Sequence, residues 1–183
     1  WPVLFRSVTG ISSSNAVPSP ISYWKLDESA GNAADPLSAN SLLNTGSLAY
    51  GSGKINNGAT SGRDRTRYLS VAANNQLNIT GDISIACWVK FNSLPSDRYE
   101  LVSKPYNGVE YGTYHLELNK NGANYELRGL SRVAGIFQTA IYTWNPSTGV
   151  WHHVVYTRTA SSGTQTLYVN GSQVAAVPNA SGP

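Results

Sequence analysis

The chain has 183 residues, which fits one domain, and a domain of this length typically buries about 70% of the surface that its unfolded chain exposes. Hydrophobic residues make up 40% and charged residues 13%, so the composition indicates a globular protein and excludes a chain that is disordered throughout. Thirteen Lys and Arg against ten Asp and Glu give a net charge of +3 without a continuous cationic stripe, so nucleic acid is not an expected partner.

The single cysteine, Cys87, excludes a disulfide within the chain. It lies in the alternating apolar stretch 83–89, where a small buried hydrophobic side chain is a simpler interpretation than a reactive thiol. No apolar run approaches the roughly 18 residues that cross a bilayer, so membrane insertion is not expected.

From the N-terminus, residues 1–20 are rich in Ser, Pro and Asn and are expected to form an extension or linker, with the folded domain over residues 21–183. The later segments alternate with a period of two, Gly, Pro and Asn separate them, and none has a period of 3.6. The sequence therefore predicts an all-β fold, an antiparallel two-sheet β-sandwich, with 82–91 as a central strand. The expected strands are 21–26, 42–50, 54–60, 68–71, 82–91, 99–104, 113–119, 124–130, 135–142, 151–158 and 164–170.

Two Asn-Gly pairs are strong hairpin signals, at 121–122 and 170–171. If the first pair forms a two-residue turn, counting back along both strands sets Glu117 directly opposite Glu126, with Cβ atoms about 5 Å apart. Such a pair is compatible with a retaining glycosidase, a cation site, or a solvated face that Arg128 relieves. The solvated face is the favoured interpretation.

Aromatic side chains in predicted loops are candidate glycan contacts. Tyr106, Asn107 and Tyr111 lie in one loop and Trp144 in another, where an aromatic ring stacks on a sugar and an amide bonds its hydroxyls. Trp144 is equally compatible with a cap over the edge of the core. The other tryptophans in alternating strands, Trp24, Trp88 and Trp151, are assigned to packing within the sandwich.

Six short segments follow one another in a characteristic order: YWKLDE from 23, GKINNGA from 53, YLSV from 68, ISIACWVKF from 83, WHHVVYT from 151 and LYVNG from 167. In this order the chain resembles laminin-G-like members of the concanavalin A-like lectin/glucanase superfamily. The resemblance implies a jelly roll and a non-catalytic, lectin-like binding or adhesion module that is not an enzyme. It would belong to a secreted, cell-surface or phage structural protein, placing it outside the cell, on its surface or on a virion, and would bind glycan or a surface protein through rim loops.

The sequence leaves two other roles open. In the main alternative, the chain is a structural or assembly subunit of a fibre or shell. A glycoside hydrolase using Glu117 and Glu126 is the least supported, because the Glu-x-Asp-x-x-Glu motif of the glucanase branch is absent.

The resemblance also implies calcium as a possible cofactor, held by oxygen ligands at the sandwich rim, and Asp27 and Asp35 are the acids expected there, with Glu28 beside them. Turn formation before Pro36 is the alternative for Asp35. In the same family the Trp-His-His string is structural, so His153 is expected in or near the core. Neighbouring histidines on a strand point to opposite faces and cannot share one metal ion.

The family continues with further strands beyond the segment at 167–171, so the expected pairing partner of the first strand is missing from the pattern. An open sheet edge recruits other chains, which makes self-assembly a possible outcome. The interpretations are a C-terminally truncated domain, which is favoured, an N-terminal segment 3–9 that fills the gap, or a strand from a neighbouring subunit.

Overall fold

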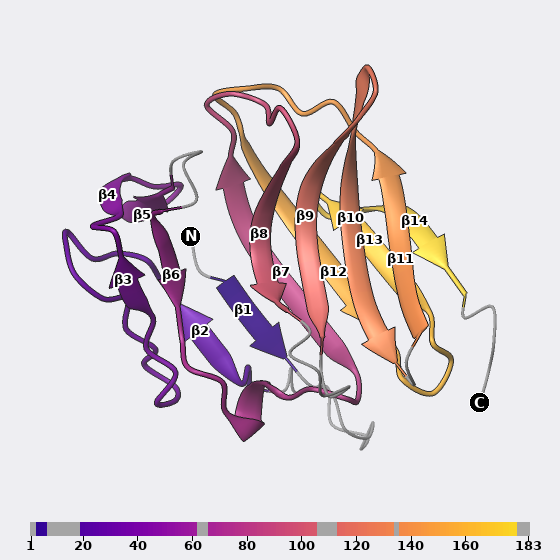
Figure 1. Cartoon of the computed structure of the whole chain (residues 1–183), viewed down its shortest axis with the longest axis horizontal. Helices are drawn as coiled ribbons and strands as arrows, with labels where there is room; N and C mark the ends of the chain where they lie inside the picture. Colours follow the sequence, from indigo (N-terminus) through magenta and orange to yellow (C-terminus); the bar gives the residue numbers. More distant parts are fainter. Residues whose placement is uncertain (1–2, 7–18, 62–65, 106–112, 134–135, 179–183) are drawn as a thin grey trace.

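Two antiparallel sheets pack as two layers, and Figure 1 shows the four-stranded sheet in front of most of the six-stranded one. The structure is a computed structural model that describes residues 3–6, 19–61, 66–105, 113–133 and 136–178. The elements are β1 (Val3–Arg6), β2 (Ser22–Trp24), β3 (Leu43–Thr45), β4 (Ala49–Ser52), β5 (Asn57–Thr60), β6 (Tyr68–Ser70), the 3₁₀ turn η1 (Asn75–Leu77), β7 (Ile83–Lys90), β8 (Arg98–Lys104), β9 (Tyr114–Asn121), β10 (Asn124–Val133), β11 (Ile136–Thr143), β12 (Trp151–Arg158), β13 (Gln165–Val169) and β14 (Ser172–Val177).

The strand order is β14-β13-β12-β7-β1-β2 in the six-stranded sheet and β11-β10-β9-β8 in the four-stranded sheet. Two small ribbons, β3–β6 and β4–β5, lie at the β2 side of the sandwich (Figure 1). The predicted all-β sandwich is therefore confirmed, and β7 is the central strand that its long alternation predicted. No helix among the described residues is both long and apolar enough to cross a membrane.

The core lies between the sheets and follows from the period of two. Alternate residues of β7, namely Ile83, Ile85 and Cys87, are buried, and they meet Leu116 and Leu127 of the facing sheet in one apolar cluster. Burial raises the pKa of the Cys87 thiol to about 12, so at neutral pH this cysteine is a packed, protonated side chain.

The assignment of all three strand tryptophans to the core is wrong for two of them. Trp24 is 3% exposed in the core, but Trp88 and Trp151 are half-buried on the outer face of the six-stranded sheet. The position of Trp88 follows from β7, whose odd-numbered residues point inward, and that of Trp151 follows from β12, whose even-numbered residues point inward. The β4–β5 ribbon covers them, with the Lys54 ammonium 4.9 Å from the Trp88 ring centre and Gly58 beside the Trp151 ring.

The sequence predicts His153 in or near the core, but the structure buries its neighbour His152 instead. His152 is the buried one, on the inner face of β12, and its Nε2 lies 3.3 Å from the carbonyl oxygen of Ser147. His153 lies on the outer face and stacks at a tilt against Trp88. Its backbone is clamped by Asn170, whose Oδ1 accepts its N–H and whose N–H donates to its carbonyl.

The two Asn-Gly turns differ. Asn170 and Gly171 both have positive φ, 51° and 85°, and they form the predicted two-residue turn between β13 and β14. In the β9–β10 hairpin, Asn121 pairs with Asn124, so the turn is Gly122 and Ala123, and only Gly122 has positive φ. The predicted register there is wrong by two residues, because Gly122 takes the first central position of the turn and not the second.

The segment 42–50, predicted as one strand, is broken between β3 and β4. Gly46 and Ser47 both have positive φ, 71° and 56°, which no extended strand allows. A Cβ on Gly46 would lie 2.1 Å from the carbonyl oxygen of Thr66, so glycine is required for this close approach.

The N-terminal segment enters the sheet. Strand β1 pairs with β2 on one side and with β7 on the other, both antiparallel. Part of the stretch expected as an extension thus fills the gap beside the first domain strand, the second of the three interpretations that the sequence left open.

Candidate functional site

The chain changes direction sharply where β2 ends. Leu26 has a φ of 61°, which is strained for a branched residue with a Cβ, and its side chain packs partly against the core. The turn directs the polar residues on either side of it, Lys25 and Asp27, to the rim of the sandwich. Strain of this kind is held by the surrounding structure and is common at binding sites.

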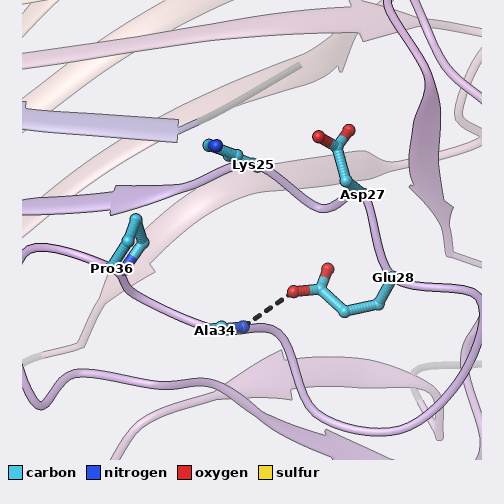
Figure 2. Close-up of a pocket in the computed structure, with 5 residues that line it drawn as sticks. All are labelled: Lys25, Asp27, Glu28, Ala34 and Pro36. Carbon is cyan, nitrogen blue, oxygen red and sulfur yellow. Dashed lines mark hydrogen bonds between the residues drawn. The ribbon is translucent and has the colours of Figure 1, made fainter.

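A hollow of about 360 Å³ opens at this rim, lined by Lys25, Asp27, Glu28, Ala34 and Pro36; we call it the first hollow. Figure 2 shows Glu28 reaching across to the segment of Ala34 and Pro36, where its Oε1 accepts the Ala34 N–H at 2.8 Å. The second carboxylate oxygen, Oε2, is shielded from solvent and accepts no hydrogen bond from the described residues. A shielded acceptor without a donor is costly, and a ligand group could reach it only if the rim moved.

The β4–β5 ribbon holds this rim in place. The Asn57 side-chain amide donates to the backbone carbonyls of Asp27 and Glu28, both at 3.2 Å. The Asn56 amide donates to Asp27 Oδ2 at 3.3 Å, and Asn56 itself has a φ of 50°. Segments about 30 residues apart in the sequence thus fix the backbone of Asp27 and Glu28 and the carboxylate of Asp27.

Asp35 is an internal hydrogen-bonding centre. Its Oδ1 accepts the backbone N–H groups of Tyr23, Leu37 and Ser38 at 3.3, 2.9 and 3.2 Å, and its Oδ2 accepts the Ser38 hydroxyl. Burial acts to raise its pKa, but these hydrogen bonds together with Ser22 outweigh burial and hold the pKa below the ordinary value. The carboxylate is therefore ionised and structural, as expected for turn formation before Pro36.

The residues do not fit the calcium site that the resemblance implies. Asp35 is 7% exposed, its oxygens are taken by N–H and O–H donors, and it does not line the first hollow with Asp27. Within the described ranges, no three His, Cys, Asp or Glu side chains gather closely enough to hold a metal ion. Calcium requires six to eight oxygen ligands, which Asp27 and Asp35 do not supply together.

The acidic pair lies on the outer face of the four-stranded sheet, but the two carboxylates do not face each other. Glu117 is opposite Arg128, and Glu126 is opposite Asn119, so the carboxylates are diagonal neighbours. Arg128 donates Nε and Nη2 to Glu126 Oε2 at 2.8 and 2.7 Å, and its Nη1 lies 4.0 Å from Glu117. The interpretation that the sequence favours is a solvated face that Arg128 relieves. Arg128 does pair with both carboxylates, but the face is not solvated, because Glu117 and Glu126 are only 8% and 9% exposed.

The two carboxylates differ in pKa although both are buried. Burial raises the pKa of Glu117, against the opposing effect of Arg98 and Arg128. A hydrogen bond from Asn121 at 2.6 Å, aided by Arg128, lowers the pKa of Glu126 despite burial. Arg128 donates directly to Glu126, whereas two guanidinium groups lie 4.0 Å from Glu117, so the two carboxylates belong to one network of charges with these arginines.

Of the aromatic candidates, only Trp144 lies among the described residues; Tyr106, Asn107 and Tyr111 lie outside them. The Trp144 ring packs edge-on against Phe91, with centroids 6.1 Å apart, and against His152, with centroids 5.0 Å apart. This half-buried position is that of a cap over the edge of the core, the alternative left open for Trp144.

Sequence reasoning found Asp27 but not the hollow around it. Lys25 and Glu28 belong to a polar strand end, which usually has no function, and Pro36 belongs to a turn. The only signal in the sequence is the charged string Lys25 to Glu28 directly after an apolar strand. The left-handed Leu26 that shapes the hollow has no sequence signature.

Two antiparallel sheets packed face to face place the chain in the β-sandwich class of proteins. Residues 62–183 match a laminin-G family model of the concanavalin A-like lectin/glucanases superfamily. The chain belongs to this family, which confirms the resemblance. A comparison with curated proteins finds no match. The matched range begins after β5, so the first hollow lies on the part of the chain that precedes it.

Proposed function

We propose that the protein is a non-catalytic, lectin-like module that binds glycan through the first hollow, as part of a secreted, cell-surface or virion-surface protein. The observation that carries the proposal is that one ammonium group, Lys25, and two carboxylates, Asp27 and Glu28, line one small rim hollow.

Sugar hydroxyls match this arrangement because each both donates and accepts a hydrogen bond. One hydroxyl would donate to the Asp27 carboxylate or to the second lone pair of Glu28 Oε1, and a neighbouring one would accept from Lys25, while Pro36 and Ala34 offer an apolar wall to the ring. Binding of this kind needs no calcium. A glycan fits better than a surface protein, because the hollow is too small for a protein interface.

A binding role is favoured over hydrolysis. Laminin-G-like domains are generally non-catalytic. Glu117 and Glu126 both form ion pairs with Arg128, and in the first hollow Glu28 accepts a hydrogen bond from the Ala34 N–H.

The test is glycan-array screening of the purified chain, followed by calorimetry with the glycans that bind. Glu28→Gln and Lys25→Ala should each weaken binding roughly tenfold or more, which corresponds to about 1.4 kcal/mol. Exposed residues elsewhere supply matched controls: Glu100→Gln on β8 and Lys120→Ala at the β9–β10 hairpin should leave affinity unchanged. The proposal fails if no glycan binds, or if the hollow variants bind as well as the controls. Release of reducing sugar would instead support an enzyme.

A second role, assembly into a fibre or shell, is favoured by one observation. Strand β11 is an edge of the four-stranded sheet, and its eight residues include no charged residue, Pro or Gly. It exposes Phe137 and Ile141, and edges of this composition pair with other chains. Light scattering should then show concentration-dependent oligomers that Thr139→Lys removes; a strictly monomeric wild-type chain would exclude this role.

A further inference from the structure

A second hollow, of about 380 Å³, lies beside the first and is lined by residues 29–32, Asn44 and residues 47–50. Its volume is within the range of small-molecule sites, roughly 300–1,000 Å³. We propose that the second hollow is a subsite for a neutral sugar residue of the same glycan chain that occupies the first hollow. This inference rests on the proposed function and adds the ligand's length and charge to it.

The walls of the second hollow are fixed before a ligand arrives. The Asn44 side-chain amide donates to the carbonyls of Gly31 at 3.0 Å and Leu48 at 2.9 Å, and its Oδ1 accepts the Leu48 N–H at 2.7 Å. The Asn44 backbone N–H donates to Asn32 Oδ1 at 2.9 Å, and the Tyr50 hydroxyl donates to the Gly31 carbonyl at 3.0 Å. Asn44 therefore joins both walls, and a site held in this way loses little entropy on binding.

The chemistry of the lining points to a neutral, hydroxylated ligand. Among the described residues that line the second hollow, none is charged, and the polar groups are hydroxyls, amides and backbone carbonyls. Ser29 and Ser47 keep hydroxyls that make no hydrogen bond within the described part of the chain, and Tyr50 provides a half-buried ring on which a sugar face can stack. A charged sugar would lose solvation here without gaining a partner charge.

The two hollows share one wall. Glu28 lines the first and Ser29 the second, and after residue 32 the chain returns to the first at Ala34. Burial, followed by the nearby charge of Glu28, raises the pKa of Tyr50, so a residue of the first hollow lies close enough to act on the ring of the second. One glycan chain of two or more residues can therefore occupy both.

The test measures affinity against chain length. Neutral cello-, manno- and xylo-oligosaccharides of one to four residues and charged oligogalacturonides of equal length are titrated by calorimetry. For the wild-type chain, affinity should rise roughly tenfold from the monosaccharide to the disaccharide or trisaccharide of the neutral series that binds. Tyr50→Ala removes the ring, and Ala30→Trp fills the second hollow from an exposed position. Both substitutions should abolish this rise and leave monosaccharide affinity unchanged.

Ala123→Trp, at the exposed β9–β10 turn, is the matched control and should keep the rise. If affinity rises with length in Tyr50→Ala and Ala30→Trp as it does in the control, or if the monosaccharide binds as tightly as longer chains, the second hollow is not a subsite although the first still binds. Equal or tighter binding of oligogalacturonides would overturn the neutral-ligand assignment. Failure of every sugar to bind would overturn both proposals.

Discussion

Two glutamates on one sheet face show how the environment of a side chain decides its role. Glu117 and Glu126 are diagonal neighbours, both with less than a tenth of their surface exposed, and both near Arg128. Glu126 receives direct hydrogen bonds from Asn121 and Arg128, whereas the arginines near Glu117 lie 4.0 Å away. Charge-assisted hydrogen bonds stabilise a carboxylate more than a distant charge does, so the pKa values shift in opposite directions.

Glu126→Gln should therefore destabilise the protein more than Glu117→Gln at pH 7. A lowered pKa means that the charged form of Glu126 stabilises the folded state above its ordinary pKa, so its loss should cost about 1.5–3 kcal/mol. A raised pKa means that the charged form of Glu117 opposes folding. Glu117→Gln should therefore either lower the free energy of unfolding by about 1 kcal/mol or less, or raise it. Urea denaturation of the two variants measures the difference, and the reverse order would contradict the ion-pair geometry.

Asp35→Asn should lower stability in a pH-dependent way. The folded pKa of Asp35 is depressed, so its contribution is fully present above the unfolded value, about 3.9, and is lost as the pH falls through the folded value. The substitution replaces one acceptor oxygen by an amide NH2 group, which is itself a donor and would face N–H and O–H donors, so it should cost about 1–3 kcal/mol at pH 7. The deficit should shrink toward pH 2 in thermal melts. A deficit that is constant with pH would show that the charge is not responsible.

At the scale of the element, the β13–β14 hairpin depends on the backbone conformation of its turn. Gly171 has a φ of 85°, and a Cβ there would meet no atom within 4 Å, so any cost of Gly171→Ala comes from the backbone alone. We expect this substitution to cost about 1–2 kcal/mol, because a left-handed residue with a Cβ is strained by that amount.

Gly51→Ala on β4 is the matched control, since its position is equally open but its φ is not positive. Chemical denaturation should place it within about 0.5 kcal/mol of the wild type. Equal losses for the two alanine variants would refute the backbone explanation.

The same hairpins show what the sequence can predict. Alternation located nearly every strand, because burial of one face imposes a period of two, and Asn170-Gly171 set its turn correctly. For Asn121-Gly122 the residue types allow two registers that keep the same side chains inward, so the pattern alone could not choose between them. The even positions of β7 could have placed Trp88 on the outer face, since Ile83, Ile85 and Cys87 already filled the inner one.

The rim was less predictable, because its hollows depend on contacts between distant segments. The acids of the first hollow could be found from the string Lys25 to Glu28, but their geometry depends on Asn57, about 30 residues later, and on the left-handed Leu26. The second hollow requires the break at Gly46, where the sequence pattern predicts a continuous strand. Hydrogen bonds of this range leave no periodic trace in a single sequence.

Considered as a whole molecule, the sandwich holds its rim together with hydrogen bonds where the resemblance implied a metal. Asp35 is saturated by donors from three residues, and Asn40, 2% exposed, joins Ser22 to Asn74 through its amide. A bound calcium ion would have to displace several of these donors, at a cost in unsatisfied N–H groups.

We therefore expect that adding calcium, or removing it with a chelator, changes the melting temperature by less than the 2–4 °C that about 1 kcal/mol would produce in a domain of this length. A ligand that binds only the folded state stabilises it by RT ln(1 + [L]/Kd), so millimolar calcium would raise the melting temperature if a site with a micromolar Kd existed. Differential scanning calorimetry with calcium, with magnesium and with chelator makes the measurement, and glycan binding measured in the same buffers provides a second readout. A calcium-specific rise that Asp35→Asn removes would show that the donors around Asp35 give way to the ion, and the hydrogen-bonded rim would then be only its metal-free form.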